Sequence, residues 1–568
     1  MANPGRQRWI NPRGLASGGT VMLLALLPLL LIIRSGYNGL DFNFHATSWL
    51  ELHNAWIAHT WRLGWAHWAH FGFGEPRFCF YPPLSLLIGG GLSFLMPFRA
   101  VPGVMAWLAL SLSGWSMYKA AESFVGREHR LSAAILYMLN PYLLLTVLRR
   151  YAIAEAWVQA LLPLTFLYFF QAISERRPRA AGIAILLLAA GWLTDIPEAI
   201  AIFYAFNFLA IVLAVRQRSI RPLAMAALIG GAAIALAAFR LLPALQEQGW
   251  ISPQAFPREL QFYMLFGKMD PDLRFGVWFD AVYIVLGVAI MLPAVRQIVR
   301  WDSAWHAPVI SFVFLAGFAV FLNFTVSIPV WNVLPEFRLV QHPFRLLPLL
   351  SVGLIVILFA RGVSSTTRKL GVACLICGEL LALASLASPY FSLRQFHFRD
   401  NPSLRVQAAE WQGGYQGQRE YVPAGISSIQ ADPSHERDLA KQGPFATSDC
   451  NPTVLQVYPN EKIIRTDSLA PCTLALNTFY YPFWKAYSED RASLAISESH
   501  AGLLQAAVPA GQHEIRLEFV PASRLRATSS IASLLMLVVL LSWTAMSKPT
   551  FGSEHETGEE FSCPVHNG

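Results

Sequence analysis

The sequence predicts an α-helical polytopic membrane protein, with about 12 transmembrane helices and a small extracytoplasmic β-sandwich domain. Of its 568 residues, 55% are hydrophobic and only 14% are charged, whereas a typical soluble domain carries roughly 25% charged residues. Apolar runs that approach membrane-spanning length recur along most of the chain. One stretch near the C-terminus changes to alternating apolar and polar residues, which is typical of strands. Together these observations exclude an ordinary soluble protein.

The apolar runs set the expected helices. The basic segment 1–13 precedes the first run, and because no small-residue cleavage site follows it, we expect a retained helix rather than a removed signal peptide. A weaker run at 82–97 is interrupted by three consecutive glycines and bounded by prolines, so we expect a re-entrant or interfacial hairpin there. The expected spans lie at 14–33, 101–121, 131–148, 156–174, 180–194, 197–215, 221–243, 279–297, 306–323, 346–361, 369–388 and 527–547.

The basic residues predict the orientation of these spans. Short loops on one side each carry two or three Arg or Lys residues, whereas the loop around Asp195 and Glu198 carries none. The positive-inside rule then places both termini in the cytoplasm. The net charge is +8, but the Arg and Lys residues lie in short clusters between the apolar runs. This distribution indicates membrane topology and not a nucleic-acid partner.

This topology divides the chain into four parts. Residues 1–388 form the transmembrane domain, with a large first outer loop at 34–100. Residues 389–526 form the outer β-rich domain, 527–547 the last transmembrane helix, and 548–568 a cytoplasmic tail. Alternation predicts strands at 453–458, 473–480, 493–497, 503–508 and 514–519, which suggest a β-sandwich.

The cysteines divide into two groups. Cys450 and Cys472 lie in the β-rich domain, where they either form a disulfide, if that domain is extracytoplasmic, or stay reduced. Cys374 and Cys377 form a CxxC pattern inside an apolar run without acid–base partners, which favours ordinary core packing over redox chemistry.

Ionisable residues gather on the outer face, where their desolvation cost usually marks a function or a bundle-interior pair. A carboxylate at the mouth of the first helix is suited to act as a general base toward a hydroxyl, and arginines match the oxygens of a phosphate. The candidate catalytic residues are Asp41 and Glu155. The candidate substrate-binding residues are His45, Glu75, Arg77, Tyr81, Arg149, Arg150, His342 and Arg345.

Plainer interpretations stand beside these. Arg149, Arg150 and Arg345 are equally suited to structural or lipid-headgroup contacts. Asp41 and His45 are four residues apart, so on a helix they share a face, as a metal pair or as a local hydrogen bond. The segment around His67 and His70 resembles an amphipathic interfacial helix. No metal ligands are assigned, the need for a divalent metal stays open, and no P-loop, Rossmann fingerprint or nucleophile elbow is present.

Several stretches resemble a known family, the bacterial membrane proteins called 6-pyruvoyl-tetrahydropterin synthase-related. The matching stretches are LDFNFH (40–45), GFGEPR (72–77), FYPPL (80–84), NPY (140–142), RYAIAE (150–155), HPFRLLP (342–348) and EYVP (420–423). Residues 480–487 and 509–514 are similar to the outer β-domain of lipoteichoic-acid-glycosylating membrane proteins.

Both groups resemble the GT-C glycosyltransferases, multi-span enzymes that use polyprenyl-phosphate sugars. The resemblance implies that Asp41 matches the catalytic acid of the first outer loop and that Glu155 is the candidate second acid. Phe42 follows Asp41, whereas many GT-C enzymes have paired acids there. The stretch Pro82-Pro83-Leu84 is similar to the end of that loop in aminoarabinose and mannosyl transferases.

The sequence therefore favours a glycosyltransferase of the bacterial plasma (inner) membrane, working on the outer face. Its expected partners are a polyprenyl-phosphate sugar donor, an envelope glycan or lipid acceptor and membrane lipids, with no nucleic acid. The alternative hypothesis is a non-enzymatic protein, either a lipid-linked glycan flippase or an envelope-assembly scaffold.

Overall fold

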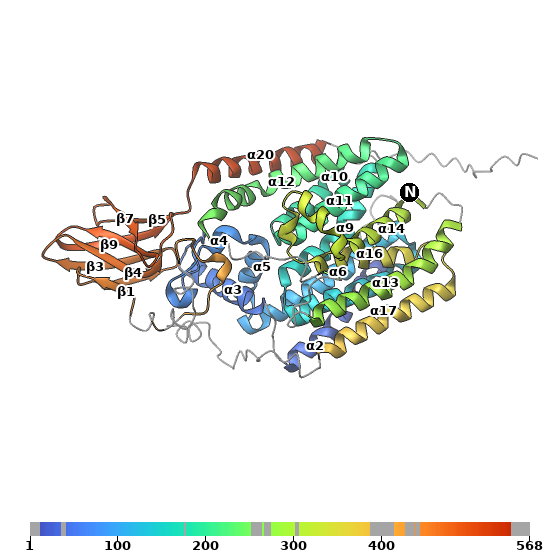
Figure 1. Cartoon of the computed structure of the whole chain (residues 1–568), viewed down its shortest axis with the longest axis horizontal. Helices are drawn as coiled ribbons and strands as arrows, with labels where there is room; N and C mark the ends of the chain where they lie inside the picture. The colour runs from blue at the N-terminus through green and yellow to red at the C-terminus, as the bar shows by residue number, and fades with distance from the viewer. Residues whose placement is uncertain are drawn as a thin grey trace, which may run out of the picture.

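The computed structural model of the chain combines a helical membrane domain with a β-sandwich at one end (Figure 1). Helices α3 (Phe42–Ile57), α4 (Arg77–Phe80) and α5 (Pro83–Leu95) lie at the end of the helical domain that faces the sandwich (Figure 1). Helix α20 (Arg524–Met546) runs back along α12 (Arg221–Glu247) (Figure 1). The structure describes residues 12–35, 41–174, 178–251, 264–265, 274–300, 306–386, 414–426, 438 and 443–546.

The predicted apolar runs all fall on helices. Within the described residues, seven helical segments are long and apolar enough to cross a membrane, and five further apolar helices are shorter. The predicted membrane class is therefore confirmed. The helices are α1 (Pro12–Leu24), α2 (Leu26–Ser35), α6 (Val101–Phe124), α7 (Arg130–Met138), α9 (Ile153–Ser174), α10 (Pro178–Trp192), α11 (Ile196–Gln217), α12 (Arg221–Glu247), α13 (Arg274–Arg300), α14 (His306–Phe321), α16 (Leu347–Leu358), α17 (Ser365–Leu386) and α20 (Arg524–Met546).

Helix α16 is the centre of the membrane domain. All twelve of its residues are buried, and it packs against α14 and α13. A helix that is apolar on every side needs neighbours on every side, which is the position that α16 occupies. Gly353 permits the close approach of α14, because a Cβ there would lie 2.9 Å from that of Ala316.

The expected hairpin at 82–97 is wrong. Residues Pro83–Leu95 form one uninterrupted helix, α5, which packs against α3 (Phe42–Ile57). The glycines serve close packing and not a turn, since a Cβ at Gly89 would lie 2.2 Å from the indole nitrogen of Trp49. A helix of 13 residues is about 20 Å long at 1.5 Å per residue, short of the roughly 30 Å hydrocarbon core.

The C-terminal sheets form the predicted sandwich. One sheet has four strands in the order β1-β4-β8-β7, and the other has five in the order β2-β3-β9-β5-β6. Inward-facing side chains of both sheets make the core, among them Leu474, Leu504, Ile515 and Leu517. The strands are β1 (Phe445–Ser448), β2 (Thr453–Tyr458), β3 (Glu461–Ser468), β4 (Cys472–Phe479), β5 (Trp484–Tyr487), β6 (Ser493–Leu494), β7 (Ile496–Glu498), β8 (Leu503–Val508) and β9 (Gly511–Phe519).

Cys450 and Cys472 form a disulfide, with their Cα atoms 5.6 Å apart, which resolves the alternative left open by the sequence. The bond joins the turn before β2 to the start of β4. The two cysteines are 22 residues apart in the sequence. Closing a loop of that length restricts the unfolded chain and therefore stabilises the folded sandwich.

We expect the double variant Cys450→Ala/Cys472→Ala to destabilise the sandwich by about 3 kcal/mol, because the unfolded chain regains the loop entropy. Hydrogen exchange of strands β1 and β4 in the lipid-embedded protein measures this free energy of opening. Wild-type protein treated with a reductant is the matched control and should show the same faster exchange. Unchanged exchange in both samples would contradict a stabilising role for the bond.

Candidate active site

Glu155, in the first turn of α9, is the centre of a buried polar cluster. Arg150 donates two hydrogen bonds to its carboxylate, at 3.0 and 2.7 Å, and Arg345 donates a third at 3.3 Å. The Tyr142 hydroxyl donates at 2.7 Å and the Gln159 amide at 3.0 Å. Five donors therefore hold one carboxylate.

The local backbone brings these groups together. Asn140 caps the short helix α8 (Pro141–Leu144), accepting a bond of 3.0 Å from the amide of Leu143. A π-helical turn, Leu145–Arg150, follows, and Tyr151 then adopts a left-handed conformation with φ of 52°. Such irregular backbone is found at functional sites because it redirects side chains that a regular helix would separate. Here it turns Arg150 back toward Glu155.

Asp41 lies beside this cluster, directly before α3. Its backbone amide donates to the carbonyl of Arg150 at 3.0 Å. Burial raises the pKa of the Asp41 carboxyl, and the charges of Arg150 and Arg345 oppose that rise. Within the described part of the chain, the Asp41 side chain makes no capping hydrogen bond and accepts none from the two arginines. Its carboxylate is consequently available to a ligand.

Three other predicted residues lie next to Asp41 or the arginines. His45 is one turn along α3, and its buried Nδ1 has no hydrogen-bond partner among the described residues. The ring of Tyr81 packs 6.0 Å from that of His45, and burial lowers the pKa of His45 to about 3, so this imidazole is neutral. The His342 ring stacks on Phe344 at 4.8 Å, and Phe344 in turn lies under the guanidinium of Arg150.

Two further acids complete the charge distribution. Asp195 caps α11 by accepting a bond of 2.9 Å from the amide of Glu198, which explains the helix start at Ile196. Burial raises the pKa of Asp195, the charge of Arg345 lowers it, and Glu155 and Asp41 raise it further. Arg149, which precedes Arg150 in the chain, is half-buried. The cluster thus combines several acids with two arginines at one end of the helices.

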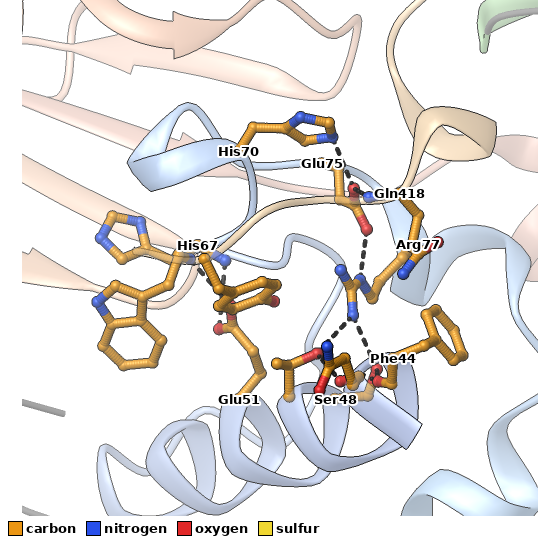
Figure 2. Close-up of polar contacts among 12 residues, drawn as sticks. Phe44, Ser48, Glu51, His67, His70, Glu75, Arg77 and Gln418 are labelled. Carbon is orange, nitrogen blue, oxygen red and sulfur yellow. Dashed lines mark hydrogen bonds and ion pairs between the residues drawn. The ribbon is translucent and has the colours of Figure 1, made fainter. Parts of the chain in front are cut away.

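Glu75 and Arg77 belong to a separate network, which Figure 2 shows above α3. Both side chains are completely buried and form an ion pair with each other. Glu75 also contacts His70 Nε2 at 2.9 Å and accepts from the amide of Gln418 at 2.8 Å. Arg77 donates to Ser48 on α3 at 3.0 Å. Their assignment to substrate binding stays a prediction, and these contacts give both residues a structural role.

Glu51 extends this network. It accepts hydrogen bonds from the amides of His67 and Trp68, at 3.2 and 2.9 Å, and from the Tyr415 hydroxyl at 3.0 Å. Burial raises its pKa to about 7, although these three donors favour the carboxylate. The expected amphipathic helix around His67 and His70 is wrong, because consecutive positive φ angles, 52° at His70 and 56° at Phe71, break any helix there.

No group of three or more His, Cys, Asp or Glu side chains converges as a metal site in the described ranges. Asp41 and His45 are connected through the helix backbone, where the His45 amide donates to the Asp41 carbonyl at 3.1 Å. This is the ordinary main-chain bond of a first helical turn, and it does not decide between the metal pair and the local hydrogen bond left open by the sequence.

Sequence reasoning missed several partners of these acids. Gln159 lies four residues after Glu155, so helix periodicity carried a signal for it. Tyr415 and Gln418 are more than 340 residues from Glu51 and Glu75 in the chain, and no local pattern connects them.

Comparison with known proteins gives one family and several distant structures. The model of the 6-pyruvoyl-tetrahydropterin synthase related domain, a membrane protein family, matches residues 78–393, more than half of the chain. No protein with a curated description matches.

Among solved structures, the apo oligosaccharyltransferase of Archaeoglobus fulgidus is similar with 14% identity and a TM-score of 0.46, covering 73% of this chain and 61% of its own. Arabinofuranosyltransferase AftD from Mycobacteria is similar with 16% identity and a TM-score of 0.44, covering 68% of this chain and 27% of its own. This chain therefore spans less than two thirds of the length of either structure.

We expect Arg77→Leu to destabilise the protein by about 3–5 kcal/mol, because it leaves the fully buried Glu75 without its charge partner. The midpoint of thermal unfolding in lipid nanodiscs measures the change. Arg127, whose ion pair with Glu122 is exposed, is the control, and Arg127→Leu should leave the midpoint unchanged. Equal midpoints for the two variants would show that the Glu75–Arg77 pair is not structural.

Proposed function

This chain belongs to the 6-pyruvoyl-tetrahydropterin synthase related family of membrane proteins, and we propose its reaction from the site itself, because the family name does not identify one. The protein is a GT-C-like membrane glycosyltransferase. It moves a sugar from a polyprenyl-phosphate donor to a cell-envelope acceptor on the outer face of the membrane. The observation that carries this proposal is an unoccupied carboxylate, Asp41, beside two partly exposed arginines.

Asp41 is the general base. Glu155 is held by five hydrogen bonds from Arg150, Arg345, Tyr142 and Gln159, which stabilise its ionised form and make it a poor proton acceptor. Asp41 has no comparable donors, and burial raises its pKa. A carboxylate with a raised pKa accepts a proton from a hydroxyl more readily. Glu155 is then a positioning residue that acts through the arginines.

Arg150 and Arg345 hold the donor phosphate. Their side chains keep 19% and 11% of their surface exposed, unlike the completely buried Arg77. Glu155 neutralises only one of the two positive charges, and a donor phosphate would share the other with Asp41 and Asp195. A guanidinium matches phosphate oxygens through paired N–H groups.

The reaction follows from this arrangement. The acceptor hydroxyl gives its proton to Asp41, and its oxygen forms a bond with the anomeric carbon of the donor sugar. The bond between that carbon and the phosphate oxygen breaks, and polyprenyl phosphate leaves with an added negative charge. Arg150 and Arg345 stabilise that charge where it develops.

The disulfide between Cys450 and Cys472 supports the outer location, because disulfides persist in oxidising compartments. A lipid-linked donor also fits a site at the ends of helices, since its tail enters the membrane while its phosphate stays at the interface. The proposed location is the bacterial inner membrane, with both termini cytoplasmic.

We expect Asp41→Asn to lower the rate of sugar transfer by about 10²–10⁴-fold, because the amide cannot take the proton of the acceptor. Purified protein in lipid nanodiscs, given a panel of radiolabelled undecaprenyl-phosphate sugars and envelope lipid and glycan acceptors, reports the release of undecaprenyl phosphate. Glu128→Gln, a change at an exposed acid, is the control and should keep full activity. Wild-type activity in Asp41→Asn would refute the assignment of the base. A folded wild-type protein without turnover on any donor would favour a flippase or scaffold.

We expect Arg345→Lys to raise the KM for the donor about tenfold, equivalent to 1.4 kcal/mol, because lysine keeps the charge but loses the planar fork. Initial rates over a range of donor concentrations separate KM from kcat. Arg338→Lys is the matched control, since Arg338 contacts Asn332 away from the cluster. An unchanged donor KM would remove Arg345 from phosphate binding.

A further inference from the structure

Lys462 occupies an unusual place in the sandwich. It lies on β3, in the same alternating register as the buried residues Ile464 and Thr466, and is itself only 8% exposed. Its ammonium donates to the Thr478 hydroxyl on β4, which belongs to the opposite sheet. A positive charge therefore fills a position between the sheets where the strand pattern normally places an apolar side chain.

No described acid balances this charge. The structure records no ion pair for Lys462, and burial alone lowers its pKa, to about 8. The neighbouring His67 has a buried Nδ1 without a hydrogen-bond partner among the described residues. Burial, followed by the charge of Lys462, lowers the pKa of His67 to about 3. A buried cation without a counter-ion is costly, so an anionic ligand bound beside Lys462 would stabilise its charged form.

A cavity of about 320 Å³ opens at these two residues. It lies where the first outer loop, the segment at Gly414 and the edge of the sandwich meet, and Trp68, Phe71 and Phe445 contribute aromatic walls. This combination of apolar walls with a few polar groups is typical of small-molecule sites, and the volume is within their range. None of the lining residues belongs to the Asp41 cluster.

We propose that this cavity binds a sugar unit that carries a carboxylate or phosphate group, with Lys462 as the counter-ion and the aromatic walls against the sugar ring. A neutral sugar would leave the ammonium unbalanced, and a purely apolar ligand would leave both Lys462 and His67 without partners. The identification of this unit as part of the acceptor glycan rests on the proposed function, whereas its binding does not. The unit is then recognised away from the reacting hydroxyl.

Protection of Lys462 from acetylation tests the proposal on the full chain in lipid nanodiscs. Acetic anhydride labels the neutral amine, and mass spectrometry measures the modified fraction, with the exposed Lys485 as an internal reference. Trigalacturonate or glucose 6-phosphate, at about ten times its Kd, should reduce labelling of Lys462 about tenfold, and the two probes separate a carboxylate from a phosphate preference. Maltotriose and inorganic phosphate should each protect Lys462 less than the anionic sugars do.

Two outcomes would overturn the proposal. One is labelling of Lys462 that no anionic sugar reduces, and the other is protection that maltotriose or inorganic phosphate alone reproduces. The Asp41→Asn variant should show the same protection as wild type, so a failure of the proposed transferase activity does not affect this result.

The variant Lys462→Met separates binding from folding. Because it removes a buried unpaired charge, the midpoint of thermal unfolding should not fall, while binding of the anionic sugar measured by calorimetry should weaken at least tenfold. Lys485→Met, at an exposed position on β5 of the same sheet, should leave binding unchanged. A lower unfolding midpoint with unchanged binding would show that Lys462 is a structural residue.

Discussion

The buried ion pair between Glu75 and Arg77 is the constraint on which the sandwich end of this molecule depends. Arg77 is bonded to Ser48 on α3, while Glu75 is bonded to the backbone of Gln418, in the segment that precedes the sandwich. One pair therefore connects a helix, a loop and a distant part of the chain (Figure 2). Because a buried charge cannot be left unpaired without a large cost, none of these segments separates easily. The position of Asp41 at the start of α3 follows from that attachment.

Two carboxylates at the site show how environment assigns different roles to similar groups. Glu155 is surrounded by donors and stays ionised, so it fixes the arginines. Asp41 is buried beside the same arginines without receiving their hydrogen bonds, and the pKa of its carboxyl is raised. Distance along the chain does not predict this division. It arises where the π-helical turn and the left-handed Tyr151 place the Arg150 guanidinium on Glu155. Irregular backbone thus decides which acid the arginines hold.

The sequence predicted what local pattern controls and missed what distant contacts control. Apolar runs located the helices, and alternation located strands such as Thr453–Tyr458. Strand β3 was missed because Lys462 interrupts its apolar face. The glycines of α5 suggested a turn, but Trp49 needs them for packing. The motif set brought Asp41, Arg150, Glu155 and Arg345 forward, while the hydrogen-bond partners from Tyr415 and Gln418 come from another part of the chain.

The segment that follows α3 connects the two proposed ligand sites physically. The amides of His67 and Trp68 are bonded to Glu51 on α3, while the side chains of the same two residues line the cavity at Lys462. Gly417 packs against the ring of His70 so closely that a Cβ would lie 2.1 Å from it, which leaves this loop little freedom to shift. A sugar bound at Lys462 therefore contacts a segment that is fixed to the helix carrying Asp41. In the proposed reaction, rigid attachment of this kind would hold a long acceptor at a constant distance from Asp41, the proposed base, and orientation of that sort is a major source of rate enhancement.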